Sequence, residues 1–267
     1  MKTQLIAIIL ICSCLLVSCS NSYQKLLKST DYDLKFEKAK EFYNNGKYSK
    51  AIPLFEELIG VYKGTKSLEK IYYYFAYSLY AQKDFLLSEF YFKNFHSFYP
   101  KSVFAEDALF MVAYCNYQLS PKDRLDQSYT GKAMDQFQIF INTYPYSEQV
   151  EEANLLIEEM RDKLEIKDFN SAKLYYDLQH YKASAVAFEN LLKNYPDTEL
   201  REEAMYYIVK SNYDYAINSI DSKQEERFRK TIDMYYDFVD KFENSKYLRE
   251  TEKIFTQSEN YIKKINN

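Results

Sequence analysis

Glycine and proline are scarce in this chain of 267 residues, which contains 4 glycines, 5 prolines and no tryptophan. An all-β protein needs more glycine than this for its turns, so the composition predicts few turns and many helices. Four scattered glycines also cannot build a glycine-rich loop of the kind that cradles phosphate groups. The scarcity therefore favours an all-α fold and argues against a nucleotide-binding loop.

Residues that perform catalysis or bind metals are equally sparse. The two histidines are His96 and His180, and neither lies near Cys, Asp or Glu residues at metal-ligand spacing. Carboxylate pairs such as Glu56-Glu57 are typical of a solvated helix face rather than of acid–base chemistry. We therefore expect no catalytic residue, no metal site, no cofactor and no small-molecule substrate, and we do not expect an enzyme.

Charge and hydrophobic content limit the partners and the size of the core. The formal net charge is -4 and lysines are interspersed with acidic residues, which argues against nucleic acid as a partner. Hydrophobic residues make up 47% of the chain, enough for a sizeable core in one elongated or two compact domains. Because no catalytic residue is expected, the function is expected to reside in surfaces.

The first nineteen residues predict an export signal. Lys2 precedes an apolar run from Leu5 to Leu16, and a core of roughly 12 residues is too short to span a bilayer of ~30 Å. The sequence Leu16-Val17-Ser18-Cys19 resembles the bacterial lipoprotein signal, in which the cysteine after the cleavage site receives lipid through its sulfur and its freed amine. The resemblance implies a signal peptide at 1–18 and a membrane anchor of covalent acyl lipid on Cys19. The alternative is an ordinary soluble signal cleaved nearby.

Cysteine usage predicts no internal disulfide. Cys12 and Cys14 leave with the signal and Cys19 is acylated, so Cys115 is the single thiol of the mature chain. Cys115 lies in a helical pattern, where a small buried side chain is expected rather than a reactive nucleophile.

A motif recurs five times in the mature chain. Successive anchor residues lie 37, 37, 59 and 37 residues apart, and an aromatic residue stands three positions before and four positions after each anchor. A spacing of three and four is the helical period, so the anchor and its aromatics share one face of a first helix in each unit. The anchors are Ala39, Ala76, Ala113, Ala172 and Val209.

A second helix is expected after each first helix. It carries a small residue followed four positions later by an aromatic residue, and a small residue lets paired helices approach closely. Tyr-Pro steps at 99–100, 144–145 and 195–196 predict the ends of three second helices, because proline biases its predecessor away from helical torsions. The small residues are Ala51, Ser88, Ala133, Ser184 and Thr231.

Four further segments complete the predicted organisation. Residues 151–166 carry apolar residues at helical spacing and predict one long helix running towards Phe169. Residues 247–265 predict an amphipathic capping helix. The polar, turn-rich segments 120–130 and 219–226 predict exposed loops.

The fivefold pattern resembles the tetratricopeptide repeat over about 230 residues, although its step exceeds the usual ~34 residues and tryptophan is absent. The resemblance implies an all-α, right-handed superhelical solenoid of about five helical hairpins with a C-terminal capping helix. In such solenoids the first helices line a concave wall that binds extended peptides. The groove residues would be Lys40, Tyr43, Tyr73, Tyr77, Tyr80, Phe110, Tyr114 and Tyr117. The alternative is that these rings pack between neighbouring repeats.

The lipoprotein signal, the five units, the long connection at 120–130 and the sequence Asn194-Tyr195-Pro196-Asp197-Thr198 together resemble the BamD family of the β-barrel assembly machinery. The similarity is to members from Bacteroidetes-type bacteria. It implies a non-enzymatic scaffold anchored by lipid at the periplasmic face of the outer membrane. Residues 19–32 would form a lipidated linker, the repeats at 33–145 would bind unfolded outer-membrane proteins, and the repeats at 146–267 would dock the barrel subunit BamA.

Two other lipoprotein classes share some of these features. A different periplasmic tetratricopeptide lipoprotein, acting as a protein–protein adaptor in cell-envelope maintenance, would have the same fold with other partners. SusD-like glycan-binding lipoproteins are longer and favour tryptophan platforms, which this chain cannot supply.

Overall fold

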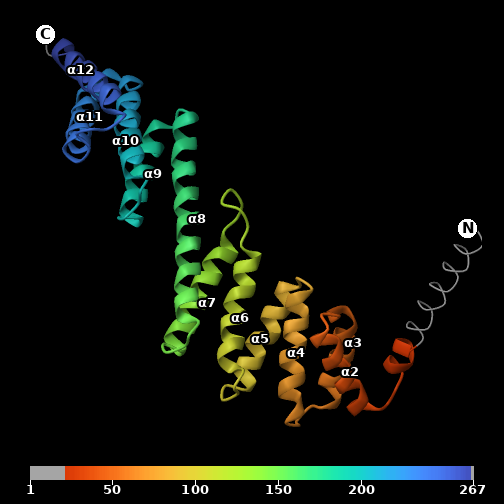
Figure 1. The fold of residues 1–267 in the computed structure, drawn as a ribbon. Helices are drawn as coiled ribbons and strands as arrows, with labels where there is room; N and C mark the ends of the chain where they lie inside the picture. The colour runs from red at the N-terminus through yellow and green to blue at the C-terminus, as the bar shows by residue number, and fades with distance from the viewer. Residues whose placement is uncertain (1–21, 266–267) are drawn as a thin grey trace, which may run out of the picture. The chain divides into compact units, whose positions relative to one another are not determined.

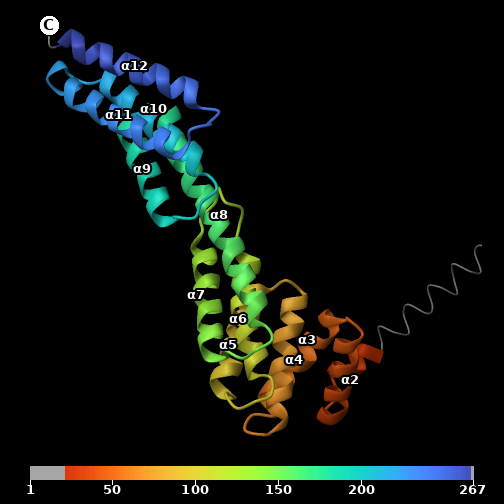
Figure 2. The same ribbon diagram turned by 60° about the vertical axis from the view of Figure 1, so that its left-hand side comes forward.

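The computed structural model describes residues 22–265, and the regular elements of these residues are all helices, as the sequence predicted (Figure 1 and Figure 2). The helices are α2 (Tyr32–Asn44), α3 (Tyr48–Val61), α4 (Ser67–Ala81), α5 (Phe85–Phe98), α6 (Ala105–Leu119), α7 (Ser128–Thr143), α8 (Val150–Asp177), α9 (Tyr181–Asn194), α10 (Arg201–Ile217), α11 (Asp221–Lys241) and α12 (Leu248–Ile265). Residues 22–27, inside the segment predicted as a linker, are also helical. None of the helices between residues 22 and 265 is both long enough and apolar enough to cross a membrane.

The chain folds into two compact units. Of the described residues, unit 1 holds those up to Pro121 together with 126–158, and unit 2 holds 122–125 together with those from Glu159 onward. Unit 1 consists of the hairpins α2–α3, α4–α5 and α6–α7, in which each helix packs against the next. In unit 2, α10 packs against both α9 and α11, and α12 covers α11 and α10. Each unit is a stack of helical hairpins of the tetratricopeptide-like kind.

The anchors of the repeated motif lie where the two helices of each hairpin meet. All five anchors are fully buried, and so are all five small residues of the second helices. The Ser88 hydroxyl donates a hydrogen bond to the Ala76 carbonyl oxygen at 2.9 Å, and the Ser184 hydroxyl donates to that of Ala172 at 2.9 Å. A buried hydroxyl needs such a partner. The same bond therefore joins two helices in unit 1 and two helices in unit 2.

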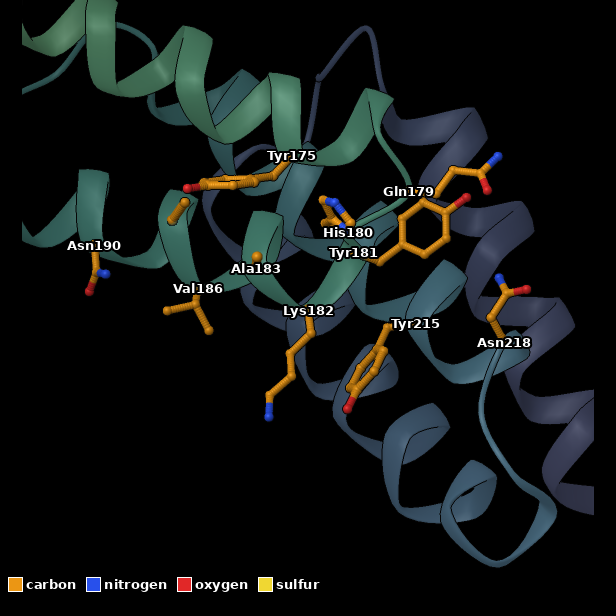
Figure 3. Close-up of a pocket in the computed structure, with 11 residues that line it drawn as sticks. Tyr175, Gln179, His180, Tyr181, Lys182, Ala183, Val186, Asn190, Tyr215 and Asn218 are labelled. Carbon is orange, nitrogen blue, oxygen red and sulfur yellow. The ribbon is translucent and has the colours of Figure 1, made fainter.

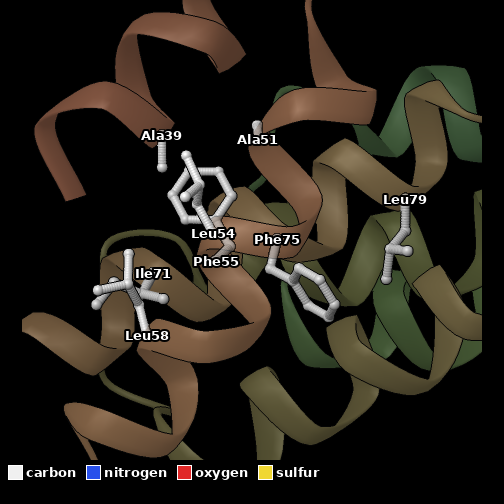
Figure 4. Packing of buried hydrophobic residues seen from close by; sticks show 8 residues of the cluster. All are labelled: Ala39, Ala51, Leu54, Phe55, Leu58, Ile71, Phe75 and Leu79. Carbon is white, nitrogen blue, oxygen red and sulfur yellow. The ribbon is translucent and has the colours of Figure 1, made fainter. Parts of the chain in front are cut away.

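Aromatic residues of the motif fill the space beside the anchors. Phe92, Phe137 and Phe188, each four positions after a small residue, are fully buried. Figure 4 shows the equivalent Phe55 in a cluster formed by α2, α3 and α4, where Ala39 and aliphatic side chains surround it. Burying a phenylalanine side chain of this kind contributes about 2–3 kcal/mol to stability. The repeat positions predicted from spacing therefore form the core.

The second helices end where the Tyr-Pro steps predicted. The helices α5, α7 and α9 stop one residue before the tyrosine of each step. In the connection that follows each of these helices, and after α11, a hydroxyl oxygen accepts a hydrogen bond from the backbone N–H two residues later, which stabilises the turn. These residues are Ser102, Ser147, Thr198 and Ser245, with distances of 3.0, 3.1, 2.9 and 3.0 Å.

Two connections are shorter than predicted. The helix α7 begins at Ser128, so the first connection spans 120–127 rather than 120–130. The helix α11 begins at Asp221, so the prediction of an exposed loop over 219–226 is wrong for most of its length. Lys223 pairs with Glu226 at 3.0 Å and Arg229 pairs with Glu225 at 2.7 Å. The polar residues that suggested a loop therefore lie on a helix, where residues one turn apart form stabilising ion pairs.

The two helices predicted outside the repeat pattern are confirmed. The helix α8 covers residues 151–166 and continues for 28 residues in all, so it also carries the anchor Ala172. The helix α12 begins one residue after the predicted start and ends at Ile265. The 59-residue step between the third and fourth anchors therefore contains an elongated helix as well as the 120–127 connection.

Cys115 is buried on α6, as predicted, and burial raises the pKa of its thiol to about 12. Its sulfur lies 3.5 Å from the Ser88 hydroxyl oxygen. In unit 2 the Ser211 hydroxyl lies 3.1 Å from the Ser184 hydroxyl, at the same sequence separation. Thiol and hydroxyl thus occupy equivalent positions two residues after the anchors of their helices.

Candidate functional site

The eight residues predicted to form a peptide groove all lie on the first helices of unit 1. They are Lys40 and Tyr43 on α2, Tyr73, Tyr77 and Tyr80 on α4, and Phe110, Tyr114 and Tyr117 on α6. The six tyrosines among them, here called the tyrosine surface, are all partly exposed to solvent. Helical spacing within each repeat is what places them on one face of their helices.

Ring contacts join most of the tyrosine surface. The rings of Tyr80 and Tyr114 are 6.0 Å apart across α4 and α6, and those of Tyr114 and Tyr117 are 5.6 Å apart. Tyr73 and Tyr77 contact each other at 4.9 Å. Tyr43 instead contacts Tyr74, which was not among the predicted residues, at 4.9 Å. Aromatic pairs at such distances stabilise one another, so much of the surface is preformed.

Asp107 on α6 holds two of the tyrosines in place. The hydroxyls of Tyr73 and Tyr77 both donate to its Oδ2, at 2.7 and 2.6 Å. Burial is the largest cause that raises the pKa of both phenols, and Asp107 raises it further. Burial also raises the pKa of Tyr43 and of Tyr80 to about 12. These four tyrosines are therefore uncharged at neutral pH.

The spacing of the tyrosines did not reveal Asp107, because that spacing describes one helix at a time. The aspartate lies in the first turn of the next first helix, in a separate repeat from the two tyrosines. An acidic residue there is ordinarily explained by the positive end of the helix dipole. The signal that could have found it is the coincidence of an acidic first turn with an aromatic face in the preceding repeat.

Phe110 and Lys40 are placed differently from the tyrosines. Phe110 is only 4% exposed, and its ring lies 5.4 Å from those of Phe137 and Phe140. Phe110 thus packs within its own hairpin. Lys40 pairs with Glu37 at 2.7 Å, and its Nζ lies 4.8 Å from the centre of the Phe36 ring. Binding of a peptide to any of these residues stays a prediction.

Unit 2 carries an open groove of 890 Å³ that the sequence analysis did not predict (Figure 3). We call it the α9 groove, because α9 supplies much of its lining through Ala183, Val186, Ala187 and Asn190. Tyr175 of α8 and Tyr215 of α10 also line it. Tyr175 is 43% exposed and Val186 is 45% exposed. The groove thus presents apolar side chains to solvent.

The α9 groove exists because α9 has two apolar stripes. Phe188 and Leu191 belong to the stripe that faces the core, whereas Ala183, Val186 and Ala187 form a second stripe at helical spacing. This second stripe is the signal in the sequence that could have revealed the groove. The Arg227 guanidinium lies 3.9 Å from the centre of the Tyr215 ring and adds positive charge beside it. Such a surface suits apolar side chains of a protein partner.

The described residues contain no candidate metal site. Between residues 22 and 265, no group of three or more His, Cys, Asp or Glu side chains is placed to hold a metal ion. His96 contacts the Tyr144 hydroxyl at 3.1 Å, and burial lowers the pKa of its imidazole. Cys19, the predicted lipidation site, lies outside the described residues.

Comparison with known proteins relates the chain to an envelope family. A family model described as YfiO, an outer membrane lipoprotein, matches residues 29–228. A putative outer membrane protein assembly factor BamD from Aquifex aeolicus (strain VF5) is 25% identical over 178 residues, which cover 66% of this chain and 58% of that protein. The outer membrane protein assembly factor BamD of Rickettsia prowazekii (strain Madrid E) is 25% identical over 165 residues, which cover 62% of this chain and 66% of that protein. The chain thus spans less than two thirds of the length of either relative.

A solved structure is also similar to the chain. The TPR2AB domain of yeast Sti1, described in a complex with pHSP90, matches with a TM-score of 0.42 and 11% sequence identity. The match covers 85% of this chain and 98% of that one.

Proposed function

The chain belongs to the YfiO family of outer membrane lipoproteins, and we propose that it is a non-enzymatic scaffold for the assembly of β-barrel proteins in the outer membrane. Two relatives that carry the name of an outer membrane protein assembly factor support the proposal. In this proposal, acyl lipid on Cys19 anchors the chain at the periplasmic face. Unit 1 binds segments of unfolded outer-membrane proteins, and unit 2 docks a barrel-forming subunit similar to BamA.

The tyrosine surface is the observation that supports the proposed binding of unfolded segments by unit 1. Tyrosine rings supply contact area for side chains, and their hydroxyls can still satisfy the backbone groups of an extended peptide. Asp107 holds Tyr73 and Tyr77 before any ligand arrives, through its two hydrogen bonds. A preformed surface loses less conformational freedom on binding, which favours affinity. An unfolded segment rich in apolar and aromatic residues is the ligand that this chemistry suits.

The α9 groove supports the partner-docking half. Its lining includes the exposed side chains of Tyr175 and Val186, and an exposed apolar patch is typical of an interaction surface. Because one chain carries both surfaces, a substrate bound to unit 1 would reach the docked subunit at a raised effective concentration. The proposed activity is thus delivery by tethering, without any covalent step.

Replacing Tyr80 and Tyr117 together with alanine should weaken the binding of an unfolded segment at least about 30-fold. Truncating an interface tyrosine costs about 1–2 kcal/mol, and two such losses give this factor. The measurement is fluorescence anisotropy with a labelled peptide from the last strand of an outer-membrane protein. Tyr146→Ala is the control, because Tyr146 belongs to unit 1 and is 99% exposed. Unchanged affinity in the double variant, with an intact helical spectrum, would remove the tyrosine surface from the proposal.

Replacing Val186 with glutamate should lower co-purification of the BamA-like subunit about tenfold or more. A charge placed in an apolar interface without a partner costs at least about 1.4 kcal/mol of binding free energy. The measurement is quantitative mass spectrometry of complexes from detergent-solubilised outer membranes. Ile220→Glu is the matched control, since Ile220 is 71% exposed and does not line the α9 groove. Equal recovery from both variants would show that the barrel subunit docks elsewhere.

A further inference from the structure

The first described residues are packed onto the first hairpin. The Tyr23 hydroxyl donates to the Lys50 carbonyl oxygen at 3.0 Å, and the Tyr23 ring lies 5.7 Å from the Phe42 ring. The Lys35 ammonium donates to the Leu27 carbonyl oxygen at 2.9 Å. Residues 22–27 therefore form one packed body with α2 and α3.

A basic pocket lies between this segment and the first hairpin. It has a volume of 540 Å³, and four lysines line it against a single acidic residue, Glu41. The lysines are Lys25, Lys38, Lys47 and Lys50. Lys38 pairs with Glu41 at 2.6 Å, whereas no salt bridge within the described part of the chain engages Lys25 or Lys47. The pocket is thus locally cationic in a chain whose formal net charge is -4.

The same pocket has an apolar component. Leu34 lines it and is 45% exposed, and the partly buried Leu26 and Phe42 line it as well. The Lys50 ammonium lies 5.5 Å from the centre of the Tyr23 ring. A protein surface that binds at the boundary between lipid headgroups and acyl chains typically combines ammonium groups with exposed apolar side chains.

We propose that this pocket binds the headgroup phosphate of anionic phospholipids and so seats the first hairpin on the membrane. The inference rests on the proposed acylation of Cys19. Two residues lie between Cys19 and Ser22, and the three steps along the chain from one to the other span roughly 11 Å at most when fully extended. A pocket lined by Ser22 therefore lies close to the bilayer surface that an acylated Cys19 would occupy. The lipid anchor and the pocket would thus supply two membrane contacts that lie close together along the chain.

The test uses the mature chain with Cys19→Ser, which cannot be acylated, and measures its co-sedimentation with vesicles. Vesicles of equal parts phosphatidylcholine and phosphatidylglycerol are compared with vesicles of phosphatidylcholine alone. Each lysine near an anionic surface strengthens binding about fivefold. Lys25→Gln with Lys47→Gln should therefore weaken binding to the anionic vesicles about 25-fold. Lys193→Gln with Lys241→Gln is the control, since both lysines are exposed on unit 2 and the charge change is equal.

Leu34→Ser separates a membrane from free phosphate as the ligand. A membrane site loses affinity in this variant, whereas a site for inorganic phosphate does not need the leucine. Displacement by millimolar inorganic phosphate with no effect of Leu34→Ser would overturn the proposal. So would equal losses in the two lysine pairs, equal binding to both vesicle types, or no binding. Because the assay contains neither substrate nor barrel subunit, its failure is distinct from failure of the assembly role, and mass spectrometry of native Cys19 tests acylation separately.

Discussion

Phe92→Ala is expected to lower the free energy of unfolding of unit 1 by about 4 kcal/mol. The Phe92 side chain is fully buried, and its ring lies 4.9 Å from that of Tyr77 and 6.3 Å from that of Tyr73. Truncation removes buried apolar area and leaves a cavity that close-packed helices fill only in part. Urea unfolding gives the loss of stability, and amide hydrogen exchange on α4 and α5 shows whether the loss is local.

The neighbouring Phe90 provides the matched control for this prediction. It lies on the same helix and is 53% exposed, so Phe90→Ala should change the free energy of unfolding by no more than about 0.5 kcal/mol. Both variants remove the same atoms from α5, but Phe92 lies on its buried face and Phe90 on its exposed face. If both variants lost a similar free energy of unfolding, the position four residues after the small residue would not belong to the core.

Glu57→Ala is expected to destabilise unit 1 by about 2–3 kcal/mol. Glu57 pairs at 2.5 Å with the ammonium of Lys35, whose side chain is 1% exposed while that of Glu57 is 39% exposed. Removing the carboxylate leaves a buried cation without its counter-charge, which costs about 3–5 kcal/mol in full burial and less here because solvent reaches the pair. The measurement is the urea midpoint of the variant chain against that of the parent.

Glu56→Ala tests the same substitution one residue earlier. Glu56 is also exposed on α3 but is not the residue paired with Lys35, so its removal should cost no more than about 0.5 kcal/mol. Lys35→Met gives a further comparison, since it removes the buried charge together with the need for a partner. If Lys35→Met destabilises more than Glu57→Ala, the hydrogen bonds that the Lys35 ammonium donates to Leu27 and Glu57, which methionine cannot make, stabilise this part of unit 1.

Much of the fold could be predicted because, in a helical repeat, the spacing of residues along each helix determines which side chains pack in the core. Ala39 and its four equivalents are buried for a reason that can be stated within one hairpin, and the Tyr-Pro steps end α5, α7 and α9 through backbone sterics alone. The start of α11 could not be predicted in the same way. Its first turns are polar, and polarity on a solvent-facing helix is indistinguishable from that of a loop.

The sequence predicted those features of the candidate site that depend on one helix alone, and not the contacts between repeats. Spacing placed the tyrosines on the first helices of unit 1, but Asp107 reaches Tyr73 and Tyr77 from another repeat, and no periodicity describes that contact. The pair of Lys35 with Glu57 was missed for a similar reason, because adjacent glutamates on a polar face look equivalent until the helix opposite them is known. The second stripe of α9 differs from these cases, because the spacing of Ala183, Val186 and Ala187 within one helix is enough to predict it.

The equivalence of the Cys115 thiol and the Ser211 hydroxyl suggests a way to remove every thiol from the predicted mature chain. Serine already serves at Ser211, beside Ser184, in the place that Cys115 takes beside Ser88. With Cys19 and Cys115 both changed to serine, a cysteine introduced at any chosen surface position would be the one attachment point for a dye or a spin label. Pairs of such labels, one in each unit, would let spectroscopists measure distances between the two units with and without the proposed ligand.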